Sequence, residues 1–225
     1  MKLLHIETAT TVCSVGISEN KILLAQHSID DGFKHAEILN SMVKNIFNET
    51  NIAPAQLSAI SVSIGPGSYT GLRIGLSFCK GLAYGLNIPV IAINTLFSMA
   101  RVAQKKINPT SNQFLVPMID ARRMEVYCSV IDHQLNEIEA TSAKIIDEHS
   151  FENLSDKELI FFGNGAKKCE TTLIRENHIF YDQNCCEASG QVELASNLFL
   201  NKIFNNLAHL EPFYLKEFQT NTKEK

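Results

Sequence analysis

The sequence predicts an α/β fold of two lobes, each a mixed β-sheet flanked by helices. Short runs rich in β-branched and aliphatic residues open each half of the chain, and segments with helical apolar spacing lie between them. The segment 108–113, NPTSNQ, is polar, contains a proline and lacks apolar periodicity, so it is the expected linker. We therefore expect a first lobe over residues 1–107 and a second lobe over 108–225, with the C-terminal tail packing back on the body.

The first lobe is expected to begin with three antiparallel strands. KLLHIE, TVCSVGIS and KILLAQHSI are β-rich runs separated by small polar turns. Over 35–50 the apolar residues recur at intervals of three and four, which predicts an amphipathic helix. SAISVSI and PVIAI predict two more strands, with a helix over 70–86 between them and another, NTLFSMARVAQKK, after them. The order β-β-β-α-β-α-β is that of a lobe in the actin, hexokinase and Hsp70 superfamily.

The second lobe is expected to repeat this strand-rich beginning, as distant duplicates would. FLVPMID, EVYCSVID, AKIID and LIFFG predict strands, and helices are expected over 167–176 and 189–204. In the last residues, EPFYLKEF offers Tyr214 and Phe218 to dock the tail.

Composition excludes several classes of protein. The formal net charge is -4, so no global field would attract nucleic acid, and any RNA contact needs a partner or a local patch. The longest apolar stretch, 72–86, contains two cations and is shorter than a membrane span. The N-terminal stretch lacks the pattern of a signal peptide, so we expect no export. Six cysteines without a C-x-x-C pair are typical of reduced thiols in the cytoplasm, and the role of Cys185 and Cys186 stays open.

The glycine-rich segment SIGPGSYTGLRIG over 63–75 has two interpretations. It follows a strand and precedes a helix, where free backbone N–H groups favour an anion such as phosphate. Its spacing nevertheless matches neither G-x-G-x-x-G nor the Walker pattern. The alternative is structural: the glycines free the backbone around Pro66 and let the helix approach closely. The spacing favours this second interpretation.

The helix that follows is apolar on most of its surface. Its polar stripe consists of Arg73, Ser77, Lys80 and Tyr84, and small residues stand at 71, 75, 81, 83 and 85. Such a helix requires burial on more than one side. The two helices of the first lobe are therefore expected to form a protein interface.

Chemistry-bearing motifs are sparse. Glu7 ends the first strand and Thr8 lies in the hairpin that follows, where ATPases of this superfamily place a metal-binding acid and a glycine-bearing phosphate hairpin, but here Ala9 replaces a glycine. Ordinary turn residues and a degenerate nucleotide site both remain open. FFGNGAKK, with Gly163 and Gly165, is the other candidate phosphate turn. No H-x-x-x-H, H-E-x-x-H or G-x-S-x-G occurs, so we expect neither a metal site nor a serine hydrolase.

The stretch IDARRMEVY predicts a tight turn between two strands of the second lobe. It contains Asp120, Arg122 and Arg123. Three interpretations stay open: a solvated hairpin, a salt bridge across the lobes, or a contact with phosphate.

Taken together, IETATTVCSVGI, GPGSYTGLRIG, DARRMEVY and EPFYLK resemble the TsaB family, also called YeaZ, of bacterial tRNA threonylcarbamoyladenosine biosynthesis proteins. The resemblance implies a non-catalytic, cytoplasmic relative of the catalytic TsaD subunit. Such a subunit pairs with the TsaD-type paralogue and, with a TsaE-type ATPase, supports threonylcarbamoyl transfer to the adenosine beside the anticodon in tRNAs reading codons that begin with A. It also implies self-association through the same surface, contact with tRNA only through the complex, and no membrane contact.

By position, the resemblance places the partner surface on the two helices of the first lobe. The residues carried over are His35, Ile38, Leu39, Met42, Val43, Leu72, Arg73, Leu76 and Lys80. It implies no catalytic residue and no cofactor of its own, with ATP and Mg bound only in the assembled complex. Glu7 stands where the family often has Asp, and Tyr69 where Phe is usual, and the longer carboxylate weakens any metal role. The rival interpretation is a peptidase- or ATPase-like enzyme of the same fold.

Overall fold

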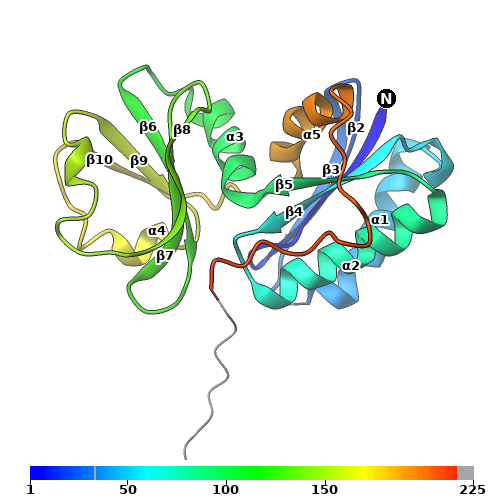
Figure 1. Ribbon diagram of the computed structural model, residues 1–225, viewed down its shortest axis with the longest axis horizontal. Coiled ribbons are helices and arrows are strands. Elements are labelled where there is room, and N and C mark those ends of the chain that lie inside the picture. The colour runs from blue at the N-terminus through cyan, green and yellow to red at the C-terminus, as the bar shows by residue number, and fades with distance from the viewer. Residues whose placement is uncertain (33, 217–225) are drawn as a thin grey trace, which may run out of the picture.

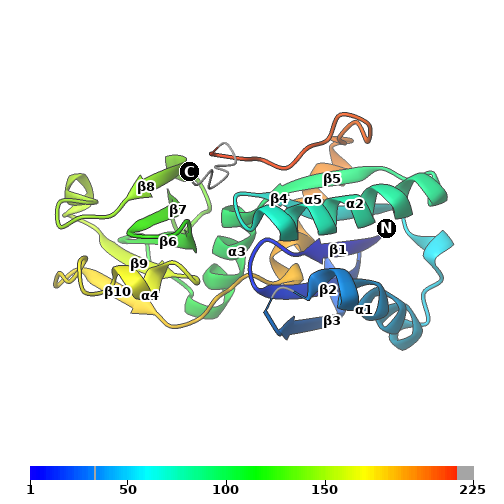
Figure 2. The same cartoon turned by 90° about the horizontal axis from the view of Figure 1, so that it is seen from below.

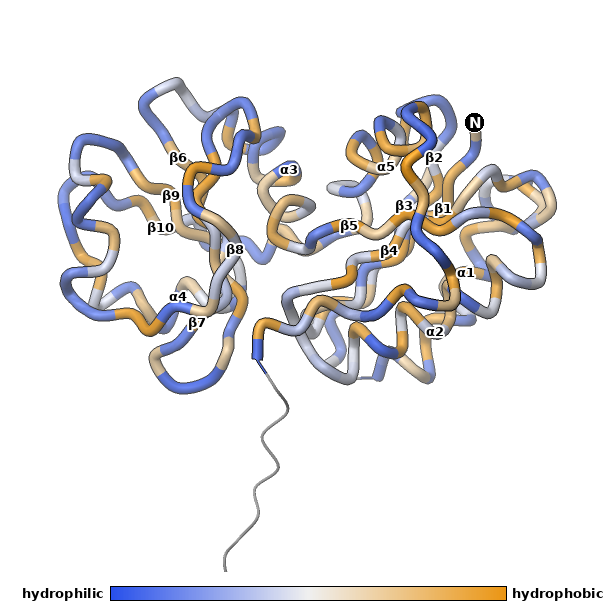
Figure 3. The backbone as a smooth tube through the Cα atoms, viewed as in Figure 1, coloured by the Kyte–Doolittle hydropathy of each residue, from blue (hydrophilic) through white to orange (hydrophobic). Residues whose placement is uncertain are grey.

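The computed structural model describes residues 1–32 and 34–216 and places them in two lobes that lie side by side (Figure 1). Each lobe is built on a five-stranded mixed sheet, so the predicted two-lobed α/β architecture is confirmed. Figure 3 shows hydrophobic residues concentrated along the strands of both sheets and hydrophilic residues in the connections. Phe218, expected to dock the tail, lies outside the described residues.

The first sheet has the strand order β3-β2-β1-β4-β5. Its strands are β1 (Lys2–Glu7), β2 (Val12–Glu19), β3 (Ile22–Asp30), β4 (Ala59–Gly65) and β5 (Val90–Asn94). β1, β2 and β3 pair antiparallel, whereas β1, β4 and β5 are parallel. The predicted antiparallel meander and the two strands that follow it are confirmed.

Three helices of the first lobe occupy the ranges that apolar periodicity predicts. They are α1 (His35–Thr50), α2 (Tyr69–Leu86) and α3 (Thr95–Ile107). Each ends at an asparagine in the left-handed conformation, with φ near 52° or 53°. Asparagine tolerates this conformation better than other non-glycine residues, so it stops a helix efficiently. A single 3-10 turn, η1 (Pro54–Gln56), leads from α1 into β4.

The second sheet has the order β10-β9-β6-β7-β8. Its strands are β6 (Gln113–Asp120), β7 (Glu125–Ile131), β8 (Glu137–Ile145), β9 (Glu158–Phe162) and β10 (His178–Tyr181). The 3-10 turn η2 (Glu152–Leu154) precedes β9. β8 begins six residues before the predicted AKIID, and β10 was not predicted, because a four-residue run carries little periodicity.

The prediction of a helix over 167–176 is wrong in its length. The observed α4 spans only Ala166–Cys169. Two threonines, 171 and 172, follow it, and β-branched residues lower helix propensity. The chain turns there instead, with the carbonyl of Cys169 accepting hydrogen bonds from the N–H groups of Thr172 and Leu173.

The two sheets share one topology. β6, β7 and β8 pair antiparallel and β6, β9 and β10 pair parallel, which repeats the pattern of β1 to β5 in the same chain order. α2 connects the two last parallel strands in the first lobe, and α4 connects the corresponding strands in the second. The suggested duplication therefore has a structural counterpart, and it makes the β6–β7 turn the equivalent of the β1–β2 turn.

The last helix, α5 (Gln191–Leu200), follows the 3-10 turn η3 (Ala188–Gly190). We expected a helix over 189–204 in the second lobe, but α5 packs on β1, β4 and β5 of the first sheet. Figure 1 shows α1 and α2 on one face of that sheet and α5 on the other, and Figure 2 shows α3 between the two sheets. Alternation along β1 explains both contacts: Leu4 and Ile6 point into the core under α1 and α2, while Leu3 points toward Ala195 of α5.

Candidate functional site

The glycine-rich segment before α2 brings that helix into contact with the β1–β2 turn. A Cβ atom on Gly67 would collide with Ala9, and one on Gly71 or Gly75 would collide with Thr8. The Thr8 hydroxyl donates a hydrogen bond to the Gly71 carbonyl at 2.8 Å. The space in front of the turn is thus filled by the helix itself, which confirms that the glycines serve close packing.

Ser68 fixes the start of α2. Its hydroxyl accepts a hydrogen bond from the Gly71 N–H at 3.2 Å, and its own N–H donates to the Ala9 carbonyl at 2.7 Å. The helix N-terminus is therefore capped by the chain's own groups.

Glu7 and Thr8, the first pair of candidate nucleotide-binding residues, are fully buried. The Glu7 carboxyl accepts a hydrogen bond from the Ala9 N–H at 2.9 Å and contacts the Ser63 hydroxyl. Burial raises the pKa of Glu7 above its ordinary value, and the hydrogen bonds oppose that rise only in part. This carboxyl is held inside the lobe.

Gly163 and Gly165, the second candidate pair, hold the β9–α4 turn against β6. A Cβ on Gly163 would meet Met118 and Met99, and one on Gly165 would meet Ile119. Gly163 also lines a cavity of about 250 Å³ in the second lobe. The two pairs lie on different sheets, and no hydrogen bond among the described residues joins them, so the structure does not bring these four positions together.

Most of the residues expected to contact a partner lie inside the first lobe. His35, Leu39, Met42, Val43, Leu72 and Leu76 are all buried. His35 donates a hydrogen bond from Nε2 to the Thr10 carbonyl at 2.7 Å, so it ties α1 to the β1–β2 turn. The expectations for His35, Leu39, Met42, Leu72 and Leu76 are corrected as direct contacts, because these side chains face the interior of their own lobe. Val43 is also buried, but it lines the surface groove described next. Ile38 and Lys80 are half-buried and Arg73 is exposed.

A surface groove lies where the outward faces of α1 and α2 meet. We call it the α1–α2 groove. Its volume is about 630 Å³, and it is lined by Asn40, Val43, Lys44, Phe47, Asn48, Pro54, Ser77, Phe78, Gly81 and Leu82. Gly81 has open space where a side chain would stand, and Tyr84, one turn further along α2, is 81% exposed. The floor is apolar and the rim carries amides and a single lysine, which suits protein docking.

Sequence reasoning listed only Val43 among the residues that line this groove. The usable signal was the stripe of small residues along α2, because a helix with Gly81 and Gly85 on its outer side can be approached closely by another backbone. Periodicity alone favours the larger apolar residues as contacts for a partner, and these residues are buried in the core of the lobe.

Arg73 binds the tail of its own chain. Its guanidinium lies 3.9 Å from the centroid of the Tyr69 ring, and its Nε donates a hydrogen bond to the Tyr214 hydroxyl at 2.9 Å. The rings of Tyr69 and Tyr214 stack with centroids 5.0 Å apart. The predicted docking of Tyr214 is confirmed, and Arg73 is occupied by it.

One histidine contacts serine hydroxyls, as a hydrolase would require, but it is sealed. His5 lies 2.7 Å from the hydroxyls of both Ser61 and Ser18, and all three residues are fully buried. Burial lowers the pKa of His5 to about 3, so the imidazole is neutral at physiological pH. No substrate reaches this trio in the present conformation, and its geometry serves packing.

In residues 1–32 and 34–216, no group of three or more His, Cys, Asp or Glu side chains is placed to hold a metal ion. No helix in the same ranges has both the length and the apolar character to cross a membrane.

The two sheets of equivalent topology define the class of protein: it is a two-lobed protein of the actin, hexokinase and Hsp70 fold. The chain belongs to the TsaD family, tRNA N6-adenosine threonylcarbamoyltransferase, whose family model matches residues 32–222. Within it the chain is similar to the tRNA threonylcarbamoyladenosine biosynthesis protein TsaB of Escherichia coli, with 28% identity over 96% of this chain and 95% of the relative. TsaB of Haemophilus influenzae is 34% identical over 58% of this chain and 54% of its own length.

Solved structures agree with this placement. YeaZ from Pseudomonas aeruginosa superposes with a TM-score of 0.79 at 25% identity, covering 95% of this chain and 99% of that one. The Lmo2764 protein of Listeria monocytogenes, named as an N-acetylmannosamine kinase candidate, has a TM-score of 0.51 at 9% identity and covers 90% of this chain and all of its own length, which shows the fold alone. The resemblance to TsaB and YeaZ and the predicted fold class are both confirmed.

Proposed function

We propose that this chain is a non-catalytic, cytoplasmic subunit of the machinery that transfers a threonylcarbamoyl group to the adenosine beside the anticodon in tRNAs reading codons that begin with A. It acts by pairing with a TsaD-type catalytic paralogue and by working with a TsaE-type ATPase. Membership of the TsaD family and the names of the TsaB relatives support the pathway. The observation that carries the subunit role is the open, apolar α1–α2 groove.

The buried chemistry supports a non-catalytic role. The β1–β2 turn, where a nucleotide phosphate would bind in an ATPase of this fold, is packed against α2 by Gly67, Gly71 and Gly75. The serine–histidine contacts around His5 are inaccessible. ATP and Mg therefore belong to the assembled complex in this proposal, and the peptidase and ATPase alternatives find no accessible site among the described residues.

The α1–α2 groove also sets what the partner must offer. Its apolar floor and the exposed ring of Tyr84 favour a partner with an apolar helix face of similar width, as a paralogue of the same fold has. A second copy of this chain presents such a face as well, so self-association and pairing with the paralogue compete for one surface.

Reconstitution tests the function directly. Threonylcarbamoyladenosine in tRNA is measured by nucleoside mass spectrometry in a mixture of the catalytic paralogue, the ATPase, the activated carbamoyl donor and tRNA, with this chain present or omitted. We expect product only when the chain is present, and none from the chain alone. Equal product without it would overturn the proposal.

The groove is tested by the substitution Gly81→Glu. A Cβ there meets nothing within 4 Å, and glutamate has a higher helix propensity than glycine, so the lobe should keep its stability. The charge would be buried without a partner only in the complex, so we expect affinity for the paralogue to fall at least about tenfold. Gln134→Glu, in an exposed turn of the second lobe, is the matched control. Unchanged affinity of Gly81→Glu in a calorimetric titration would exclude the groove.

A further inference from the structure

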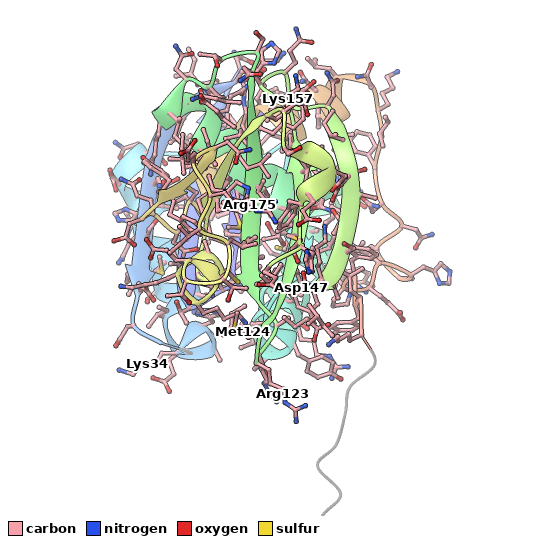
Figure 4. The ribbon with its side chains drawn as sticks, turned by 90° about the vertical axis from the view of Figure 1, so that its left-hand side faces the viewer. Lys34, Arg123, Met124, Asp147, Lys157 and Arg175 are labelled. Carbon is pink, nitrogen blue, oxygen red and sulfur yellow. The ribbon has the colours of Figure 1, made fainter. Side chains whose placement is uncertain are left out.

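The β6–β7 turn is the uncovered counterpart of the sealed β1–β2 turn. In the first lobe the 18-residue α2 covers its turn, whereas in the second lobe α4 has only four residues. Arg122, Arg123 and Met124 of the β6–β7 turn are consequently exposed. Figure 4 shows Arg123 and Met124 at one end of the molecule, opposite Lys157.

Lys168 of α4 holds this turn in shape. Its ammonium group contacts the Asp120 carboxylate and donates hydrogen bonds to the carbonyls of Arg123 at 2.7 Å and Glu125 at 2.6 Å. The Arg122 N–H donates to the same Asp120 carboxylate at 2.9 Å. The turn is thus built by interactions within the chain and does not depend on the arginine side chains.

Both arginines have left-handed backbone conformations, with φ of 70° at Arg122 and 49° at Arg123. Such conformations are uncommon for residues other than glycine, asparagine and aspartate, and they are disfavoured for a long side chain. Two adjacent arginines therefore occupy positions whose backbone conformation asparagine or glycine would adopt at a lower energetic cost.

The nearby carboxylates are already paired with lysines. Asp120 pairs with Lys168, and Glu125 pairs with Lys216 of the tail. Neither arginine side chain makes an ion pair or a hydrogen bond with any residue in 1–32 or 34–216. Of the three interpretations that the sequence left open, the salt bridge across the lobes is excluded for those residues, and two guanidinium groups stay available at the surface.

The surface around the turn extends the positive charge toward the first lobe. Lys216 and Arg122 both lie close enough to Tyr127 to lower the pKa of its hydroxyl, although burial, the largest effect, raises that pKa overall. Two residues before Lys216, Tyr214 stacks on Tyr69 beside Arg73. On a chain with a net charge of -4, this is a local cationic and aromatic surface.

We propose that the β6–β7 turn, through Arg122 and Arg123, binds backbone phosphates of RNA, and that the RNA is the tRNA substrate of the assembled complex. The proposal rests on the proposed function for the identity of the RNA. A planar guanidinium donates two parallel hydrogen bonds that match a phosphate. Both arginines are exposed on a turn at one end of the molecule, where an extended polyanion can reach the two guanidinium groups together.

The test is a titration of fluorescently labelled tRNA with the complex of this chain and the paralogue, followed by anisotropy at several salt concentrations. The variant is Arg122→Asn with Arg123→Asn, because asparagine accepts the left-handed backbone and the fold should be retained. The control, Lys157→Asn with Lys202→Asn, removes the same charge elsewhere, and Lys202 also has a positive φ of 56°.

We expect the arginine variant to bind tRNA about five- to twentyfold more weakly near 0.1 M salt. The slope of log affinity against log salt should become shallower by about 1 to 2, since two phosphate contacts are lost. The control should keep both values. An unchanged affinity and slope would overturn the proposal. The proposal would also be overturned if the arginine variant no longer bound the partner ATPase but kept its affinity for tRNA, because the turn would then bind an acidic protein surface.

The two proposals fail separately. The titration needs no turnover, and the chain alone is titrated in parallel so that the result does not depend on assembly. Product formation with and without the chain decides the proposed function, whereas the arginine variant decides the RNA contact.

Discussion

His5 is the residue through which acid should destabilise this protein. It is fully buried between two serine hydroxyls, one of them that of Ser61. The Ser61 hydroxyl donates a hydrogen bond to the side-chain oxygen of Gln191 in α5, and the amide nitrogen of Gln191 donates to the Ile6 carbonyl at 2.8 Å. Burial lowers the pKa of His5 from 6.5 to about 3. Above pH 6.5 the imidazole is neutral in both the folded and the unfolded state, so His5 does not reduce the free energy of unfolding. Below that pH the imidazole is protonated in the unfolded state but stays neutral in the folded state, so the free energy of unfolding falls progressively down to about pH 3.

The substitution His5→Gln tests this. The free energy of unfolding of the natural protein should fall by up to about 1.4 kcal/mol more per pH unit than that of the variant, between pH 6.5 and 4. Urea titrations at four pH values measure the difference. Glu7, whose raised pKa acts with the opposite sign, is common to both proteins and cancels. Parallel stability profiles would contradict the assignment.

Individual residues were the hardest part of the site to predict. The sequence identified the apolar positions of α1 and α2, but a helix that is apolar on most sides does not reveal which side its own sheet covers. Leu72 and Leu76 were therefore expected at the surface and lie in the core. The two arginines of the β6–β7 turn could be located from the sequence, yet their lack of a partner depends on Lys168, 45 residues away from Arg123.

At the scale of elements, α2 has two faces with opposite requirements. The inner face carries glycines and leucines that match the β1–β2 turn and the sheet, and the outer face carries Ser77, Gly81 and Tyr84. Substitutions four or five residues apart on this helix should therefore have unrelated effects.

Leu76→Glu makes the contrast with Gly81→Glu. Leu76 is only 5% exposed, so a glutamate there would bury a charge without a partner in the isolated lobe. We expect the free energy of unfolding to fall by more than about 3 kcal/mol, measured by urea titration with circular dichroism. The family resemblance places Leu76 in the partner surface, where the same change would break only the assembly, and its burial contradicts that position. A variant of normal stability that fails to assemble would contradict the loss of stability expected here.

Elements of the first lobe were predictable because their helices are long and strongly periodic and end at asparagines. In the second lobe, α4 and β10 have four residues each, which is too short for a period to register. The neighbouring sheet determines their conformation, as β10 shows: it is a strand because it pairs with β9.

At the scale of the whole molecule, the tail joins the two lobes. The Phe213 N–H donates to the Ile64 carbonyl at 2.7 Å, Tyr214 stacks on Tyr69, and Lys216 pairs with Glu125 of β7. Three successive contacts thus run from the end of β4 to the second sheet.

A chain ending at Glu211 should expose this junction. We expect amide hydrogen exchange around the β4–α2 connection to accelerate at least about tenfold, because the hydrogen bond from Phe213 and the ring of Tyr214 are lost. The free energy of unfolding should drop by about 1 to 3 kcal/mol. Exchange in β9 and β10 should stay as it was and serves as the internal control. Identical exchange at β4–α2 in both chains would show that the tail contributes nothing there.

The position of α5 has a consequence for how the protein is made. Leu3, Ala59 and Ile93 of the first sheet are covered by Ala195, so β1 (residues 2–7) is covered only after α5 (residues 191–200) has been made. Until about residue 200 has left the ribosome, one side of the first sheet lacks its cover, and its apolar residues face water or a chaperone. Contacts this distant in sequence also slow folding, since a long loop must close first. The first sheet is therefore exposed to aggregation until α5 is made, whereas the core of the second sheet that runs from Val116 to Leu173 does not include α5.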